Sequence, residues 1–258
     1  MEKEIDPRRK LFGLAAALAC LLFLRGCAME KYSEIETLEI HPHRTLKLYF
    51  ETPATPSDTI LILFFGANGR ATVPNILSRT APIFVGKGLS VVIVDEPLFF
   101  QSSRASPEHL EDIRKVVEEI GAHGFKRIYL VGTSNGTISV AHAGSHLRDE
   151  RIKGLVLSAT QSYYIRKHVP IEQTSYPVLF IHHKFDDCPI NSYEEALQLS
   201  QKYVHSPRVD FVTMNGGENE QPYPCSDMSY HDFGEKEKEF AQLVSDWVLG
   251  KEISKEIY

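Results

Sequence analysis

Short, continuous runs of apolar residues recur along the chain, and they constrain its fold more than any other feature. Each run is rich in Val, Ile and Leu, which is typical of a strand buried on both faces of a parallel sheet. The runs cover residues 59–65, 90–95, 127–132, 154–159 and 177–182. They predict the centre of a parallel sheet.

Amphipathic segments separate these runs. Within residues 107–122, Ile113, Val116 and Ile120 recur at helical spacing, and charged residues occupy the other face. Helical patterns also cover residues 134–147, 193–203 and 235–249. The alternation of strands and helices predicts one doubly wound, mostly parallel α/β domain.

Weaker strand signals lie on both sides of this pattern. Residues 35–40 and 45–50 are expected to form strands, separated by a turn at His41-Pro42-His43. Residues 208–214 form a last, more polar run, which we expect nearer an edge of the sheet.

The composition excludes several classes of protein. The chain has 258 residues, 43% of them hydrophobic and 24% charged, which suits one large α/β domain or two small ones and argues against wholesale disorder. A net charge of -6 argues against a general nucleic-acid binder, which needs a basic face. Four cysteines are too few for a disulfide scaffold and are not spaced as a zinc site.

Residues 1–26 have the layout of a secretory signal peptide. Arg8, Arg9 and Lys10 precede an uncharged apolar run, residues 11–24, and a small residue, Gly26, lies near the expected cut. As a helix this run would rise about 21 Å, which is short of the roughly 30 Å hydrocarbon core of a bilayer. We therefore expect an export signal in preference to a stable transmembrane helix or a buried helix.

Leu24-Arg25-Gly26-Cys27 resembles a bacterial lipobox, in which a small residue precedes a cysteine that becomes diacylated. Arg25 departs from that pattern, and the other three positions match it. The resemblance implies a lipid on Cys27, a mature chain of residues 27–258, and anchoring to a membrane of the bacterial cell envelope, on the outer membrane or facing the periplasm. An uncleaved anchor and an ordinary signal peptide are the alternatives.

Gly132-Thr133-Ser134-Asn135-Gly136 joins a predicted strand to a helix of small residues. A nucleophile on such a sharp turn has a strained backbone, and Cβ atoms two residues to either side would collide. The serine would lie over a helix N-terminus, where main-chain N–H groups stabilise negative charge. The motif predicts that Ser134 is a nucleophile; the alternative is a chance match in an ordinary strand–helix turn.

A glycine-rich loop, Gly66-Ala67-Asn68-Gly69, follows the run at 59–65. In a doubly wound sheet this loop lies beside the nucleophile loop. An oxyanion hole needs one N–H from the residue after the serine, here Asn135, and another from this loop, for which Ala67 is the first choice and Asn68 the second. A plain glycine turn is the alternative.

The acid and base that such a serine needs are expected in two later loops. Asp186 and Asp187 follow the run at 177–182, where an acid can orient a histidine and stabilise its charged form. Asp186 is the first choice and Asp187 the second, and a helix cap is the alternative. His231, just before the final helix, is the expected base, and His205 is its competitor.

His182 and His183 invite a metal-binding interpretation because they are adjacent histidines. A strand would point the two side chains to opposite faces, so a shared metal is not expected.

Together these motifs resemble the α/β-hydrolase family, with Ser134, Asp186 and His231 in that family's order of nucleophile, acid and base. The resemblance runs from the strand at 59–65 to the last helix. Two departures are Phe65 before Gly66, where the family often has His, and a stretch at 161–173 that is short enough to form only a small lid.

The resemblance implies an acyl-transfer enzyme that needs no metal or organic cofactor. A small-molecule ester, thioester or amide would acylate Ser134, and water would then release the product. One alternative is a non-catalytic envelope lipoprotein that uses the same fold for binding. A peptidase or acyltransferase is another, because the triad residues do not determine which substrate is chosen.

The four cysteines divide according to this interpretation. Cys20 lies in the signal segment, and Cys27 would carry lipid. Cys188 and Cys225 lie close in sequence to the expected acid and base, so their sulfurs are expected to meet if the acid and base loops meet, in an exported domain where disulfides persist. Two free thiols are the alternative.

Overall fold

The computed structural model describes residues 33–41, 44–95, 101–219 and 221–258. Residues 34–258 form one compact unit. The expected signal segment, residues 1–26, and Cys27 lie outside the described residues. Among the helices that are described, none has both the length and the apolar character that a membrane crossing requires.

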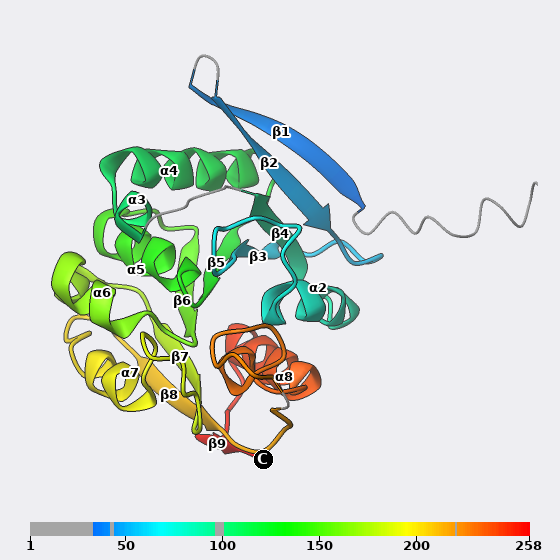
Figure 1. Cartoon of the computed structure of the whole chain (residues 1–258). Helices are drawn as coiled ribbons and strands as arrows, with labels where there is room; N and C mark the ends of the chain where they lie inside the picture. Colours follow the sequence, from blue (N-terminus) through cyan, green and yellow to red (C-terminus); the bar gives the residue numbers. More distant parts are fainter. Residues whose placement is uncertain (1–32, 42–43, 96–100, 220) are drawn as a thin grey trace, which may run out of the picture. The chain divides into compact units, whose positions relative to one another are not determined.

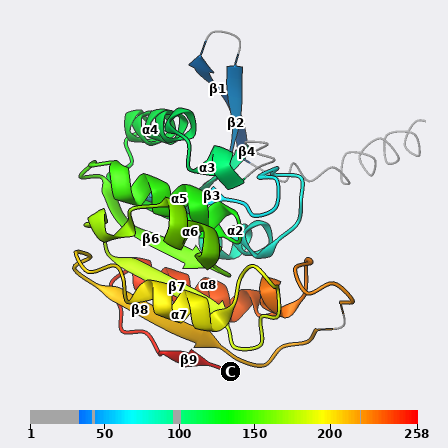
Figure 2. The same ribbon diagram turned by 60° about the vertical axis from the view of Figure 1, so that its left-hand side comes forward.

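The centre of the unit is a nine-stranded sheet with the order β1-β2-β4-β3-β5-β6-β7-β8-β9 (Figure 1). The strands are β1 (Glu34–His41), β2 (Arg44–Glu51), β3 (Thr59–Phe64), β4 (Ser90–Asp95), β5 (Arg127–Thr133), β6 (Ile152–Ser158), β7 (Val178–His183), β8 (Val209–Met214) and β9 (Glu256–Ile257). The pairs β1–β2 and β2–β4 are antiparallel, and all the other pairs are parallel. The β1–β2 hairpin and β9 therefore lie at opposite edges of the sheet (Figure 2).

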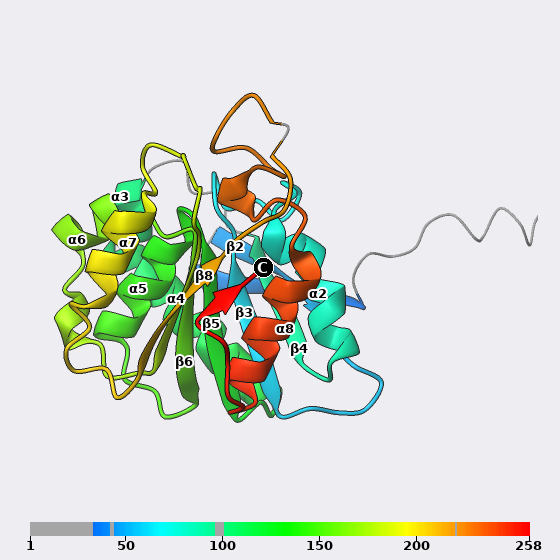
Figure 3. The ribbon, with the colours of Figure 1, turned by 90° about the horizontal axis from the view of Figure 1, so that it is seen from below.

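Helices cover both faces of the sheet. The helices are α2 (Ile76–Gly86), α3 (Gln101–Arg104), α4 (Pro107–Ala122), α5 (Gly136–His146), α6 (Ser162–His168), α7 (Tyr193–Ser200) and α8 (Glu237–Val248), with short 3₁₀ turns η1 (Ile171–Gln173) and η2 (Tyr230–Asp232). Viewed along the sheet, α2 and α8 lie on one face and α4, α5, α6 and α7 lie on the other (Figure 3). This is the doubly wound arrangement that the sequence predicts.

Burial explains why the apolar runs became central strands. All six residues of β3 are buried, because helices cover this strand on both faces. Ile62 and Leu130 of β3 and β5 belong to one core cluster with Ile113 and Val117 of α4. The parallel pairing of β3, β5, β6 and β7 brings the carboxyl ends of these strands to one edge of the sheet, where the site lies.

The sequence missed some elements at the periphery. Helix α2 was not predicted; its interior contains Pro82, which normally argues against a helix, and it begins at a capping box formed by Asn75 and Ser78. Strand β9 is only two residues long, and it separates β8 from the edge of the sheet. The stretch at 161–173 contains only α6 and η1, which agrees with the predicted small lid.

Candidate active site

Ser134 lies at the sharp turn between β5 and α5. Its φ angle is 51°, in the left-handed region that costs energy for a residue with a side chain. A Cβ atom on Gly132 would lie 2.6 Å from the Gly136 carbonyl oxygen, and one on Gly136 would overlap the Phe64 carbonyl group. Both glycines are therefore required by close backbone approach, as the sequence predicts.

Asp186 and His231 meet although 45 residues separate them. His231 Nδ1 lies 2.9 Å from Asp186 Oδ2, and both side chains are buried. Asp186 Oδ1 accepts a hydrogen bond of 3.0 Å from the main-chain N–H of Cys188, which fixes the other side of the carboxylate. The alternative acid, Asp187, is exposed to solvent.

His205, the competing histidine, lies elsewhere. It is exposed, and its Nδ1 lies 2.6 Å from the carbonyl oxygen of Glu172. Of the two candidate bases, His231 is the one that the fold brings to the cavity beside Ser134.

Cys188 and Cys225 form a disulfide, with a Cα–Cα distance of 4.8 Å. The bond connects the loop after β7, which holds Asp186, to the loop after β8, which holds His231. The pairing expected from the positions of the two cysteines is thus present in the structure. It joins two loops whose cysteines lie 37 residues apart in the sequence.

A cavity of about 140 Å³ has both Ser134 and His231 in its lining. Its wall also includes Gly66 and Ala67, the apolar residues Val73 and Pro74, and residues 225–227. Between the described residues Ser134 and His231 no hydrogen bond is formed; in free enzymes such bonds are often long and tighten only with substrate.

The Gly66–Gly69 loop forms a tight turn in which Gly69 N–H donates to the Gly66 carbonyl oxygen at 2.9 Å. Ala67 has a φ of 45°, and it lines the cavity. Asn135 lies directly before α5, and its side-chain amide donates to the Ala67 carbonyl oxygen at 3.2 Å. The loop and the start of α5, which carry the two predicted oxyanion donors, are therefore in direct contact.

The buried Asp232 and the partly buried Arg79 form an ion-pair network that the sequence did not reveal. Asp232 Oδ1 accepts from the Ile76 N–H at 2.8 Å, and Oδ2 accepts from Arg79 at 2.6 Å and from the Met228 N–H at 3.2 Å. Arg79 also pairs with Glu237 at 2.6 Å and with Asp227. The network fixes the His231 loop to the start of α2.

The electrostatics of Asp232 are unusual for a carboxylate. Burial raises its pKa, Asp227 adds to the rise, and Arg79 opposes it. Because Arg79 is 153 residues distant in the chain, no local sequence pattern could have indicated this pair.

His182 and His183 make separate contacts, which agrees with the predicted opposite orientation. His182 Nε2 accepts from the Thr160 N–H at 3.2 Å, and its Nδ1 lies 3.8 Å from Asp186 Oδ2. His183 Nε2 instead lies 2.8 Å from the Gly216 carbonyl oxygen. Burial lowers the pKa of His182 to about 4, so the ring is neutral near pH 7.

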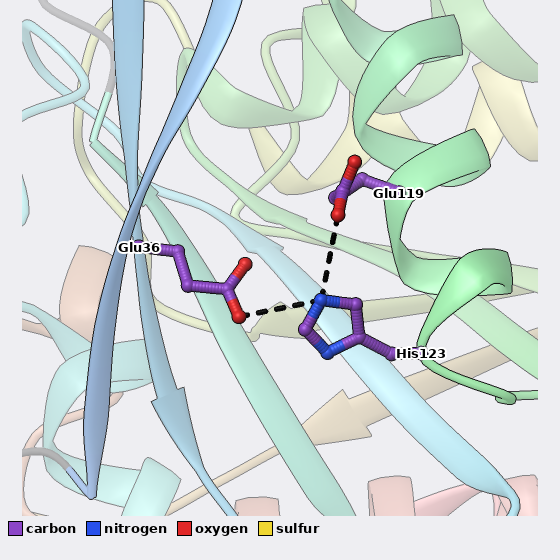
Figure 4. A group of neighbouring side chains, drawn as sticks. All are labelled: Glu36, Glu119 and His123. Atoms are coloured by element: carbon purple, nitrogen blue, oxygen red, sulfur yellow. Dashed lines mark ion pairs between the residues drawn. The ribbon is translucent and has the colours of Figure 1, made fainter.

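A different group of side chains has the composition of a metal site. His123 Nε2 lies 3.3 Å from Glu36 Oε1 and 3.5 Å from Glu119 Oε1 (Figure 4). When His123 is protonated, these contacts are ion pairs that connect β1 to the end of α4. None of the three residues lines the cavity at Ser134, so chemistry at that serine does not involve them.

Comparison with known proteins gives matches in structure alone. Neither protein-family models nor curated protein sequences match this chain. Est1E from Butyrivibrio proteoclasticus superposes with a TM-score of 0.64 at 16% identity, over 84% of this chain and 98% of that one. A dienelactone hydrolase from Anabaena variabilis gives 0.63 at 15% identity, over 84% and 97% of the two chains.

A third structural neighbour is an alpha-beta serine hydrolase homologue from Coxiella burnetii, with a TM-score of 0.62 at 19% identity, over 83% of this chain and 96% of that one. These likenesses extend over almost the entire length of each neighbour. Together with the sheet order and the helices on both faces, they show that this chain has the α/β-hydrolase fold.

Proposed function

We propose that this protein is a serine hydrolase that cleaves small carboxylic esters or related acyl compounds. The observation that carries the proposal is the hydrogen bond between His231 and Asp186 at the edge of the cavity that contains Ser134. The strained backbone of Ser134 supports the same assignment, because such strain clusters at functional sites.

In this proposal His231 Nε2 takes the proton of Ser134 Oγ while Oγ attacks the acyl carbon. Asp186 holds His231 in the tautomer with hydrogen on Nδ1 and stabilises the imidazolium. The N–H groups of Ala67 and Asn135 receive the oxyanion. His231 then protonates the leaving alkoxide, and a water molecule that it activates releases the acid from Ser134.

The size of the cavity favours a short acyl group. Its volume, about 140 Å³, is well below the roughly 300 to 1,000 Å³ of sites for drug-sized ligands. The small lid formed by α6 and η1 agrees with an accessible site. Two structural neighbours are named as esterases, one from an Arctic intertidal metagenomic library and one from Thermogutta terrifontis, and they favour an ester as the substrate.

A series of esters with increasing acyl length tests this function on the full chain. We expect the highest kcat/KM with the shortest acyl groups. Asp186→Asn should lower kcat by about 10⁴-fold, because the histidine tautomer is then wrong. Asp187→Asn is the matched control, since this neighbouring acid is exposed and should retain full activity. A folded Ser134→Ala protein with wild-type activity would refute the proposal.

We further propose export, with residues 1–26 as the signal peptide, Cys27 as the lipidated residue and residues 27–258 as the mature domain in the bacterial envelope. The lipobox-like sequence supports this, and the Cys188–Cys225 disulfide suits an oxidising compartment. Metabolic labelling with a fatty acid should label the wild type, and Cys27→Ser should abolish the label. Equal labelling of the two proteins would refute lipidation at Cys27.

A further inference from the structure

Arg104 is a buried arginine at the end of α3 that lies outside the Ser134–His231–Asp186 group. The residue is 2% exposed, so its guanidinium is almost completely removed from solvent. A charged side chain is rarely buried to this extent unless specific partners hold it. The partners of Arg104 include the main chain of the loop that carries Ala67.

One nitrogen of Arg104 contacts the loop on both sides of the Gly66–Ala67 peptide. Its Nη2 donates to the Phe65 carbonyl oxygen at 3.0 Å and to the Ala67 carbonyl oxygen at 3.4 Å. The peptide between those two carbonyl groups carries the Ala67 N–H. Holding the carbonyl groups on either side restricts the direction of that N–H, together with the bond from the Gly69 N–H to the Gly66 carbonyl oxygen.

The other terminal nitrogen of Arg104 reaches the helix that follows the nucleophile. Its Nη1 donates to Ser139 Oγ at 3.2 Å, one turn into α5. Ser139 Oγ in turn lies 2.8 Å from Nε2 of the buried His109 on α4. Since α5 begins directly after Asn135, Arg104 connects the elements that carry the two proposed oxyanion donors.

We infer that Arg104 is a positioning residue that holds the oxyanion hole in its working geometry, by joining the Gly66–Gly69 loop to α5 through its planar guanidinium. The inference rests on the proposed function. Ala67 needs this support, because its left-handed φ of 45° is strained and the loop has no side chain at its two glycines to hold it.

The effect should appear in the chemical step. An oxyanion exists only after the serine has attacked, so a misdirected Ala67 N–H weakens binding of the transition state and leaves binding of the substrate unchanged. Loss of one oxyanion donor typically lowers kcat by 10² to 10³, and a displaced donor should cost somewhat less. The His231–Asp186 pair is untouched, so the pH dependence of kcat/KM should keep its shape.

The experiment compares the full-length wild type with Arg104→Ala on the shortest active ester. We expect a kcat lower by roughly 100-fold and a KM within about twofold of the wild type. Guanidinium ion, at concentrations that leave the protein folded, should restore part of the lost kcat by entering the space left by the side chain; urea should not. Arg148→Ala is the control, because Arg148 also donates to carbonyl groups but lies away from the cavity.

If Arg104→Ala does not fold, Arg104→Lys and Ser139→Ala replace it. A lysine is a point charge that cannot reproduce the planar fork, so Arg104→Lys should lower kcat with little change in KM. Ser139→Ala should do the same, because it removes the α5 contact of Arg104 along with the contact between Ser139 and His109. A folded Arg104→Ala or Arg104→Lys enzyme with wild-type kcat overturns the inference. An inactive wild type, or an active Ser134→Ala protein, would instead overturn the proposed function.

Discussion

The two halves of the candidate site are held in place in different ways. The nucleophile half, Ser134 and the Gly66–Gly69 loop, lies directly at the carboxyl ends of β5 and β3, and steric constraints on a few neighbouring residues determine its geometry. The acid–base half depends on His231, in a long irregular segment after β8. Cross-links to distant residues hold that segment: one disulfide and the Arg79–Asp232 network.

The difference shows where each half is vulnerable. The nucleophile half should fail when a side chain is added where no space exists. The acid–base half should fail when a cross-link is removed, because the segment between β8 and α8 has little regular structure of its own.

The largest effect on stability is expected for Gly136→Ala, which disturbs the backbone of the nucleophile half. Its Cβ would overlap the Phe64 carbonyl group of the central strand β3, so the backbone must shift. We expect a loss of about 4 kcal/mol or more in the free energy of unfolding. Gly86→Ala is the control, because nothing lies within 4 Å of its Cβ, and it should be neutral or slightly stabilising. Equal urea midpoints for the two variants would contradict the steric account.

Replacing both Cys188 and Cys225 by Ser removes the disulfide that holds the acid–base half. The disulfide closes a loop with a sequence separation of 37, for which chain entropy gives about 3 to 4 kcal/mol. We expect urea unfolding at a lower concentration and a lower kcat. Reductant should destabilise the wild type in the same way and leave the double variant unchanged. A wild type that is indifferent to reductant would show that the disulfide does not stabilise the site.

Asp232→Asn tests the Arg79–Asp232 network, the second set of contacts that holds the acid–base half. The amide has only one acceptor oxygen, so it cannot accept from the Ile76 N–H on one side and from Arg79 and the Met228 N–H on the other. The substitution also removes the negative charge beside Arg79, which keeps Glu237 and Asp227 as partners. We expect a loss of about 2 to 3 kcal/mol, together with a fall in kcat as the His231 loop loosens. Asp227→Asn, at a more exposed carboxylate on the same arginine, should have the smaller effect. The reverse ranking would place the main contact of Arg79 at the surface.

The smallest effect concerns pH. Burial holds the pKa of His182 at about 4, against about 6.5 when unfolded, so its contribution to stability is complete above pH 6.5 and is lost as the pH falls toward 4. Lowering the pH from 7.5 to 5 should cost about 2 kcal/mol through this residue. His182→Gln should show a correspondingly flatter dependence of urea stability on pH. An unchanged slope would mean that the pKa of His182 is the same in the folded and the unfolded protein.

The same contrast explains what the sequence could predict. Apolar runs in the local sequence are sufficient to predict central strands such as β3 and β5. The local motif is also sufficient to predict the glycines beside Ser134, because a Cβ atom there would collide with the nearby backbone. Position in the sequence favours Asp186 over Asp187, and the contact between Asp186 and His231 agrees with that prediction. The Cys188–Cys225 pairing followed only because the acid and base loops were expected to meet.

Other features depend on long-range packing and had no sequence signal. Arg79 and Arg104 look like ordinary surface arginines in the sequence, yet one is bound to Asp232 and the other to the Phe65 carbonyl group. Their roles arise from the way α2 and α3 pack against the loops, and neither helix was predicted. A partner 153 residues away cannot be read from local periodicity.

The most direct test of the central claim is to map the adduct of a fluorophosphonate probe on the folded, full-length chain. We expect a single labelled residue, Ser134. Labelling should be abolished by Ser134→Ala, strongly slowed by His231→Ala, and unaffected by Ser226→Ala, a serine in the lining of the same cavity. A folded protein that takes up no probe, or an adduct on Ser226 in place of Ser134, would contradict it.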